Sequence, residues 1–157
     1  MGTLQDAYKV AIINEIKSQN LYALLAIAFE NEESVSLFKN LEQFEKVHED
    51  KLTAIYSQAY PDEELVLDHS TVHAFQEKPG LEDPKRLLEF AINKEIEASD
   101  KYREIAEQTG EEKIRRFFLE LSREEENHRD ILEKEIHRLQ GTMMWFDEAE
   151  LNGLVEH

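Results

Sequence analysis

Glu45-Lys46-Val47-His48 and Glu125-Glu126-Asn127-His128 are two copies of one motif, Glu-x-x-His, and each lies in a stretch with helical periodicity. Side chains three residues apart on a helix point in similar directions, about one turn apart. Apolar residues recur at helical spacing around both motifs, with Glu45 at the edge of its apolar stripe. Both motifs are therefore predicted to face the interior of a helical protein.

The two motifs belong to an internal repeat with an interval of 80 residues. Two single glutamates, Glu15 and Glu95, are separated by this interval, and so are Tyr22 and Tyr102. Several coincidences at one interval indicate a duplicated helical hairpin that carries two matching sets of polar side chains. The candidate site residues are the six inward acids and imidazoles of this repeat: Glu15, Glu45, His48, Glu95, Glu125 and His128.

The composition indicates one helical domain of 157 residues, with 41% hydrophobic and 34% charged residues. Five glycines and three prolines are too few for a turn-rich β fold. A net charge of −17 argues against a nucleic-acid partner. The sequence has no cysteine, which excludes disulfides, thiolate catalysis and thiolate-bound iron or zinc within it.

No stretch is apolar enough to span a membrane, and residues 1–10 lack the apolar core of a signal peptide. We therefore expect a cytoplasmic protein with no membrane partner.

Helix signals divide the chain into two hairpins. A capping box at Thr3 begins the first helix, and the second is predicted over residues 34–60 with Asn31 as its cap. Asp83-Pro84 begins the third, Thr109-Gly110 ends it, and the fourth ends at Gly141. Residues 61–83 lack helical periodicity, so the fold class is all-α: a four-helix bundle with one long crossover between the second and third helices.

This bundle is expected to occupy residues 1–141, and residues 142–157 to form a tail, as a short docking helix. Three further apolar side chains are predicted to be buried. Phe44 is expected to face inward, and Val66 and Phe75 to pack the crossover onto the bundle. Further aromatic residues are predicted at the surface and indicate self-association as a homodimer or larger homo-oligomer: Phe29, Phe38, Phe117, Trp145 and Phe146.

Four carboxylates that face one another in a core repel strongly, because the dielectric constant there is low. The inward positions of the stripes supply no lysine or arginine to balance them. Two divalent cations would neutralise four carboxylates, and two neutral imidazoles would complete the donor set. Di-iron carboxylate bundles have this arrangement of ligands: two helices each supply one Glu, and the other two each supply one Glu-x-x-His motif. Tyr22 and Tyr102 are predicted to hydrogen-bond to the site carboxylates.

Other polar residues near the motifs or in the crossover have a simpler interpretation. Glu126 and His137 are expected on solvated helix faces, and His69 and His73 on the surface of the crossover. Glu97 is expected to be an exposed neighbour of Glu95 on a different face of its helix.

At the segments 15–22, 44–48, 94–102 and 124–128 the chain resembles the ferritin-like di-iron carboxylate superfamily, and within it the rubrerythrin group. The resemblance extends over roughly residues 4–139. It implies that Glu45 and Glu125 bridge two metals, that Glu15 and Glu95 bind terminally, and that His48 and His128 each serve one metal.

The chain departs from typical relatives in three ways. Typical rubrerythrins add a rubredoxin domain with four cysteines, which is absent here, so turnover would need an external electron donor such as a separate rubredoxin. Many also carry a glutamate where this chain has Ala98, with Glu97 one position short. Bacterioferritins place a haem-binding methionine where this chain has Lys46, so no haem is expected.

The resemblance implies a non-haem di-iron oxidoreductase that reduces hydrogen peroxide or oxygen while Fe(II) is oxidised. Two iron ions are the expected cofactor, with manganese or zinc as substitutes that the same ligands would accept. One alternative is a ferroxidase or iron storage or delivery protein of the ferritin or bacterioferritin type. Another is a non-enzymatic helical interaction module.

Overall fold

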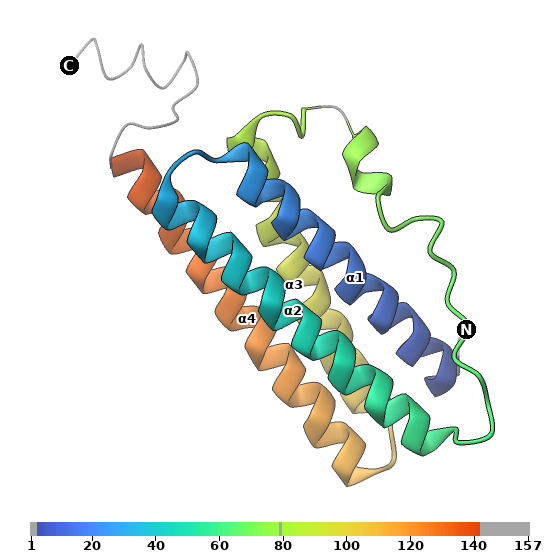
Figure 1. Ribbon diagram of the computed structural model, residues 1–157. Coiled ribbons are helices and arrows are strands. Elements are labelled where there is room, and N and C mark those ends of the chain that lie inside the picture. The colour runs from blue at the N-terminus through green and yellow to red at the C-terminus, as the bar shows by residue number, and fades with distance from the viewer. Residues whose placement is uncertain (1–2, 79, 142–157) are drawn as a thin grey trace.

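A computed structural model describes residues 3–78 and 80–141. Four long helices make up most of this part of the chain: α1 (Leu4–Ala28), α2 (Glu32–Ala59), α3 (Pro84–Gln108) and α4 (Glu112–Gly141) (Figure 1). A short 3₁₀ helix, η1 (Ala74–Glu77), lies in the crossover. The described residues form no strand, and the predicted all-α four-helix bundle with a long α2–α3 crossover is confirmed. The predicted tail helix falls at 142–157, outside the described residues.

The first three helices have the caps that the sequence predicts, and the side chains of these caps accept from the first free backbone N–H groups. The Thr3 hydroxyl accepts from the N–H of Asp6, and the Asp6 carboxylate accepts from the N–H of Thr3, at 3.1 and 3.2 Å. Asn31 caps α2 and Asp83 caps α3, where Pro84 occupies the first turn. The α2 helix begins two residues before the predicted start, at Glu32.

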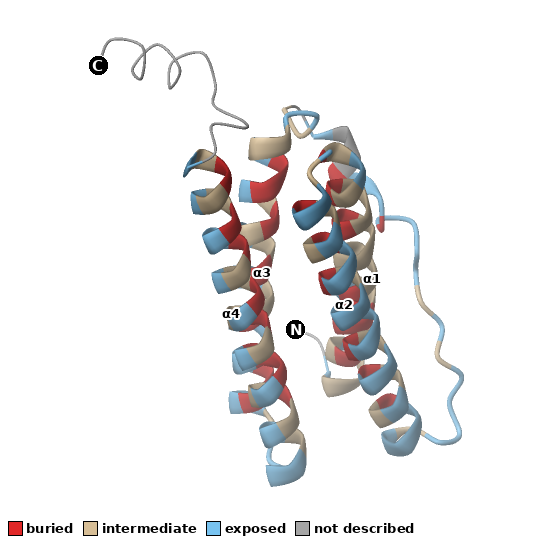
Figure 2. Ribbon diagram, turned by 60° about the vertical axis from the view of Figure 1, so that its left-hand side comes forward, coloured by how far each residue is buried: buried red, intermediate tan, exposed pale blue. Residues whose placement is uncertain are grey.

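Each hairpin is closely packed, α1 against α2 and α3 against α4, whereas the contacts between the hairpins are fewer and run mainly from α1 to α3. Figure 2 shows that every helix turns its buried residues toward the interior of the bundle. The crossover runs along the outer side of α1 in Figure 1. Long polar side chains on the inner faces are thus placed between the two hairpins.

Two apolar clusters fill opposite ends of the bundle. One contains Leu25, Phe38, Leu88 and Leu132, and the other contains Tyr8, Leu52, Ile105 and Phe118. The six candidate site residues belong to neither cluster and lie at the middle of the four helices, between them. This arrangement separates a polar layer from solvent along the bundle axis.

The predicted inward face of α2 was wrong by one residue at its centre. Phe44 is 55% exposed, whereas Glu45 is fully buried instead of lying at the edge of the stripe. Phe38, predicted at the surface, is fully buried and its ring packs 5.2 Å from that of Phe29, which is also buried. The buried α2 positions follow one continuous stripe through Phe38, Leu41, Glu45, His48 and Leu52, and Phe44 lies one helical step off that line.

Two other placements were also wrong. Phe117 is half-buried and packs edge-on to Phe118. Val66 is 66% exposed, so it does not fasten the crossover. Val72 and Phe75 do so, and the Phe75 ring stacks 6.1 Å from that of Phe90. Trp145 and Phe146 lie outside the described residues. Self-association stays a prediction.

Candidate metal centre

The structure brings all six predicted site residues together at the middle of the bundle. Glu15 comes from α1, Glu45 and His48 from α2, Glu95 from α3, and Glu125 and His128 from α4. Each keeps 3% or less of its surface exposed. Helical spacing of three residues turns each Glu-x-x-His pair toward the same side, and the antiparallel packing brings the four helix centres to one level.

The six side chains form two groups with shared members. One group is Glu15, Glu45, His48 and Glu125; the other is Glu45, Glu95, Glu125 and His128. Within each group the atoms that could bind a metal ion all lie within 4.8 Å of one another. Glu45 and Glu125 belong to both groups, so each offers a carboxylate to two neighbouring positions.

Both imidazoles turn Nδ1 into the cluster. Nδ1 of His48 lies 3.2 Å from an oxygen of Glu125 and 3.6 Å from oxygens of Glu15 and Glu45. Nδ1 of His128 lies 2.9 Å from Glu45 and 3.3 Å from Glu125. The two rings stack with centroids 5.7 Å apart.

The cluster fails to satisfy its own hydrogen-bonding groups, and this tests whether a metal fits. Ten buried side-chain polar atoms in the described part of the chain lack a hydrogen-bond partner, and eight of them belong to these six residues. They are both oxygens of Glu45 and Glu125, one oxygen each of Glu15 and Glu95, and both Nδ1 atoms. Buried polar atoms without partners are costly. Hard carboxylate oxygens and imidazole nitrogens converging in this way suit divalent metal ions.

Two buried tyrosines hold the outer carboxylates, which confirms the predicted hydrogen bonds. Tyr22 of α1 donates to Oε1 of Glu95 at 2.5 Å, and Tyr102 of α3 donates to Oε1 of Glu15. Each tyrosine therefore binds the glutamate of the other hairpin. Burial and the facing carboxylate raise the pKa of both hydroxyls well above the usual value, so they remain donors. The second oxygen of each glutamate stays free to face the cluster.

The electrostatics reflect crowded acids. Burial, followed by the charge of Glu125, raises the pKa of Glu15, Glu45 and Glu95. Burial acts in the same direction on Glu125, but the imidazoles of His128 and His48, with Nδ1 3.3 and 3.2 Å from its carboxylate, outweigh burial and bring the pKa of Glu125 to about 2. Burial lowers the pKa of His48, but the hydrogen bond with Glu124 and the nearby carboxylates of Glu125 and Glu15 outweigh this and raise the pKa to about 12. Metal ions would have to displace these protons.

One carboxylate that touches the site was not predicted from the sequence. Oε2 of Glu124 lies 2.6 Å from Nε2 of His48, the ring nitrogen that faces away from the cluster. Because Glu124 is the first of three consecutive glutamates, nothing in the pattern distinguishes it from a solvated neighbour. A second buried polar cluster was also missed: Glu135 accepts from Ser34 and Arg138.

Three histidines expected at the surface lie there. His69, His73 and His137 are exposed. Glu97 is exposed and pairs with Lys94 at 3.0 Å, so it does not join the cluster.

No helix in the described part of the chain combines the length and apolar character needed to cross a membrane.

Comparison with known proteins gives a family and a fold. The sequence profile named Rubrerythrin matches residues 6–136, with a second, overlapping match at 86–153. Among solved structures, a hypothetical protein from Pyrococcus furiosus is 24% identical with a TM-score of 0.75, covering 88% of this chain and 91% of its own. An uncharacterised conserved protein from Magnetospirillum magnetotacticum MS-1 is 23% identical with a TM-score of 0.65, covering 87% and 95%.

No curated protein matches this sequence. At these identities the two solved structures support the fold alone, whereas the family profile spans most of the chain. The bundle, the paired Glu-x-x-His motifs and this match lead to one conclusion: the chain belongs to the rubrerythrin family.

Proposed function

We propose that this protein is a di-iron oxidoreductase that reduces hydrogen peroxide, and more slowly oxygen, at the centre described above. One observation carries the proposal. Two groups of buried acids and imidazoles share Glu45 and Glu125, which is the ligand pattern of two adjacent metal positions. In this assignment Glu45 and Glu125 would serve both metal positions, Glu15 and His48 would complete one of them, and Glu95 and His128 would complete the other.

The chemistry that two ferrous ions would supply there is two electrons, which with two protons would convert one hydrogen peroxide into two waters. The chain contributes the surroundings for this chemistry. The apolar clusters above and below the site exclude bulk water, which strengthens the electrostatic interactions inside. Tyr22 and Tyr102 fix the outer carboxylates, and Tyr–carboxylate pairs also hold protons next to the reacting position.

The reductant that restores the ferrous state comes from outside this sequence. It contains no cysteine, so nothing within these 157 residues could hold a rubredoxin-type iron. We therefore propose a separate electron donor, such as a rubredoxin.

A ferroxidase that serves iron storage or delivery is the second candidate, because it would use the same six ligands. The rate with each oxidant and the size of the assembly separate the two. A much faster reaction with peroxide and a dimer favour the peroxidase, whereas a fast reaction with oxygen and a large hollow shell favour the ferroxidase.

Anaerobic loading with Fe(II) followed by metal analysis and stopped-flow absorbance tests the proposal. We expect two irons per chain and faster oxidation by hydrogen peroxide than by oxygen. Glu45→Ala should abolish binding of the pair, while Glu104→Gln, at an exposed position of α3, should leave it unchanged. Uptake of far fewer than two irons, or uptake unaffected by Glu45→Ala, would refute the site.

A further inference from the structure

The two halves of the centre have matching ligands but different surroundings. We propose that the two metal positions are unequal: the Glu15–His48 position is tight and closed, and the Glu95–His128 position is open. Metal exchanges at the open position, and small polar molecules such as hydrogen peroxide reach the centre there. This inference rests on the metal centre proposed above and goes beyond it by assigning different tasks to its two halves.

The first difference is the partner of the histidine ring. His48 turns Nδ1 toward the carboxylate cluster, and its Nε2 lies 2.6 Å from Oε2 of Glu124. With the proton on Nε2, the ring donates to Glu124 and leaves the Nδ1 lone pair for a cation. A carboxylate placed in this way fixes the orientation of a ligating imidazole and makes it a stronger base.

The other histidine lacks such a partner. In the 80-residue repeat the residue equivalent to Glu124 is Phe44, so a phenyl ring stands next to His128 where a carboxylate stands next to His48. The Phe44 ring lies 5.6 Å from the ring of His128. In the part of the chain that the structure describes, the ion contacts of His128 all involve Nδ1, and no carboxylate pairs with its Nε2. An aromatic face is a much weaker acceptor than a carboxylate. The ring of His128 is therefore held less firmly than that of His48.

The second difference is access. A pocket of about 160 Å³ between α3 and α4 reaches Glu95, which is itself 3% exposed. It is large enough for several water-sized molecules. Nε of Arg129, which lines the pocket, is buried and has no hydrogen-bond partner. It can therefore donate a hydrogen bond to a small polar molecule that enters the pocket. The remaining walls are polar or charged side chains and one isoleucine: Ile96, Ser99, Asp100, Arg103 and Glu126.

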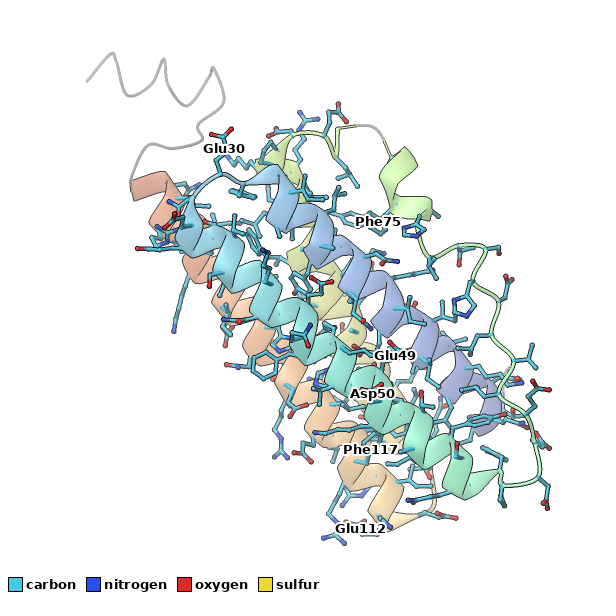
Figure 3. The ribbon with its side chains drawn as sticks, in the orientation of Figure 1. Glu30, Glu49, Asp50, Phe75, Glu112 and Phe117 are labelled. Carbon is cyan, nitrogen blue, oxygen red and sulfur yellow. The ribbon has the colours of Figure 1, made fainter. Side chains whose placement is uncertain are left out.

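In the first half, the two side chains equivalent to Ser99 and Arg129 bond to each other, whereas at the pocket Ser99 bonds to Glu126 and Nε of Arg129 has no partner. The repeat replaces Ser99 and Arg129 with Gln19 and Glu49, and Nε2 of Gln19 donates to Oε1 of Glu49 at 2.7 Å. Gln19 also lies 3.3 Å from the backbone oxygen of Glu15. This bond ties α1 to α2 beside Glu15, and Figure 3 shows Glu49 on the side of α2 toward α1. Both differences thus strengthen or close the same half.

Loss of cobalt to a chelator tests the inequality directly. The whole chain is loaded with two Co²⁺, mixed with excess EDTA, and followed by visible absorbance. We expect two phases, each corresponding to one cobalt per chain. Glu124→Ala should speed the slow phase by about 10–100-fold and change its absorption spectrum, since carboxylate partners of ligating histidines carry roughly this effect on affinity. Glu120→Ala, an exposed position one turn earlier on α4, is the matched control and should change neither phase.

Two gain-of-function variants keep the test independent of damage to the fold. Phe44→Glu gives His128 the partner that His48 has, and should slow the fast phase, whereas Phe44→Leu should not. Ser99→Gln with Arg129→Glu copies the Gln19–Glu49 bridge across α3 and α4, and should also slow the fast phase while leaving the slow one unchanged. Circular dichroism and thermal unfolding of the metal-free variants verify that each is folded.

The outcomes separate this inference from the proposed function. If two cobalt ions bind and leave in a single phase, or if Glu124→Ala changes both phases equally, the inequality is wrong while the binuclear centre stands. If fewer than two ions bind to the wild-type chain, the binuclear centre itself is wrong.

Discussion

Replacing Glu45 with glutamine should make the metal-free protein more stable while disabling its metal centre. Glu45 is fully buried, both its oxygens lack partners, and it belongs to both ligand groups. Two unit charges 4.8 Å apart, the limit within each group, repel by about 3 kcal/mol at an effective dielectric constant of about 20. Protonation relieves part of this repulsion, so we expect Glu45→Gln to raise the free energy of unfolding by about 1–3 kcal/mol at neutral pH.

Urea and thermal denaturation of chelator-treated protein measure this gain. For a chain of this size, each kcal/mol corresponds to about 2–4 °C in Tm. With metal the wild type should become more stable than the variant. At a free metal concentration of 100 times Kd, each bound ion stabilises the wild type by about 2.7 kcal/mol. The variant lacks a carboxylate shared by both positions and should gain much less. Glu104→Gln removes an exposed charge and should stay within about 0.5 kcal/mol of wild type under both conditions.

The reasoning fails if Glu45→Gln destabilises the metal-free protein, because the buried acids would then support the fold without metal. It also fails if Glu104→Gln gives an equal gain, because relief of the overall net charge of −17 would then explain the effect. A wild-type Tm that does not respond to Zn²⁺ or Fe²⁺ would refute the proposed metal site.

Three further predictions follow from the same contacts. Because burial raises the folded pKa of Glu45, the folded chain binds more protons than the unfolded chain above pH 4.5, so stability of the metal-free protein should fall as pH rises from about 5 to 8. Glu125, with a pKa of about 2, acts oppositely: its contribution is present above pH 4.5 and is lost as pH falls toward 2. Urea titrations should thus show a maximum near about pH 5, and a steady rise from pH 5 to 8 would contradict this. Tyr22→Phe removes the hydrogen bond that holds Glu95 and should weaken metal binding about 10–100-fold, as measured by calorimetry. Tyr60→Phe is the control, and a Tyr22→Phe variant that binds metal as tightly as the wild type would show that Tyr22 does not position Glu95. Arg138→Met leaves Glu135 with Ser34 as its one partner and should lower the free energy of unfolding by about 1–3 kcal/mol, measured by thermal unfolding. Metal affinity should not change, and a loss of metal binding would show that the two polar clusters are coupled.

The helical hairpins, the crossover and the six inward groups can all be predicted from local sequence patterns and from the 80-residue repeat. Periodicity and caps such as Thr3 and Asp83 are local properties, so they can be read without knowing what each helix packs against. The repeat added the long-range information, because matched intervals imply matched positions in two similar hairpins. The repeat did not define the inward face of α2 to within one residue. Phe44 is predicted to face inward but is exposed, and Glu45 occupies the buried position beside it.

Which side chains meet across the bundle depends on how the four helices pack, and this cannot be read from the sequence. Tyr22 shares a helix with Glu15 but binds Glu95, because α1 packs against α3 and each tyrosine reaches across. Glu124 looks like any solvated acid in a run of three, until the packing of α2 on α4 sets it against His48. A repeat predicts equivalent ligands, but the groups behind them depend on non-equivalent residues brought together from different helices, and those contacts arise only when the chain is folded.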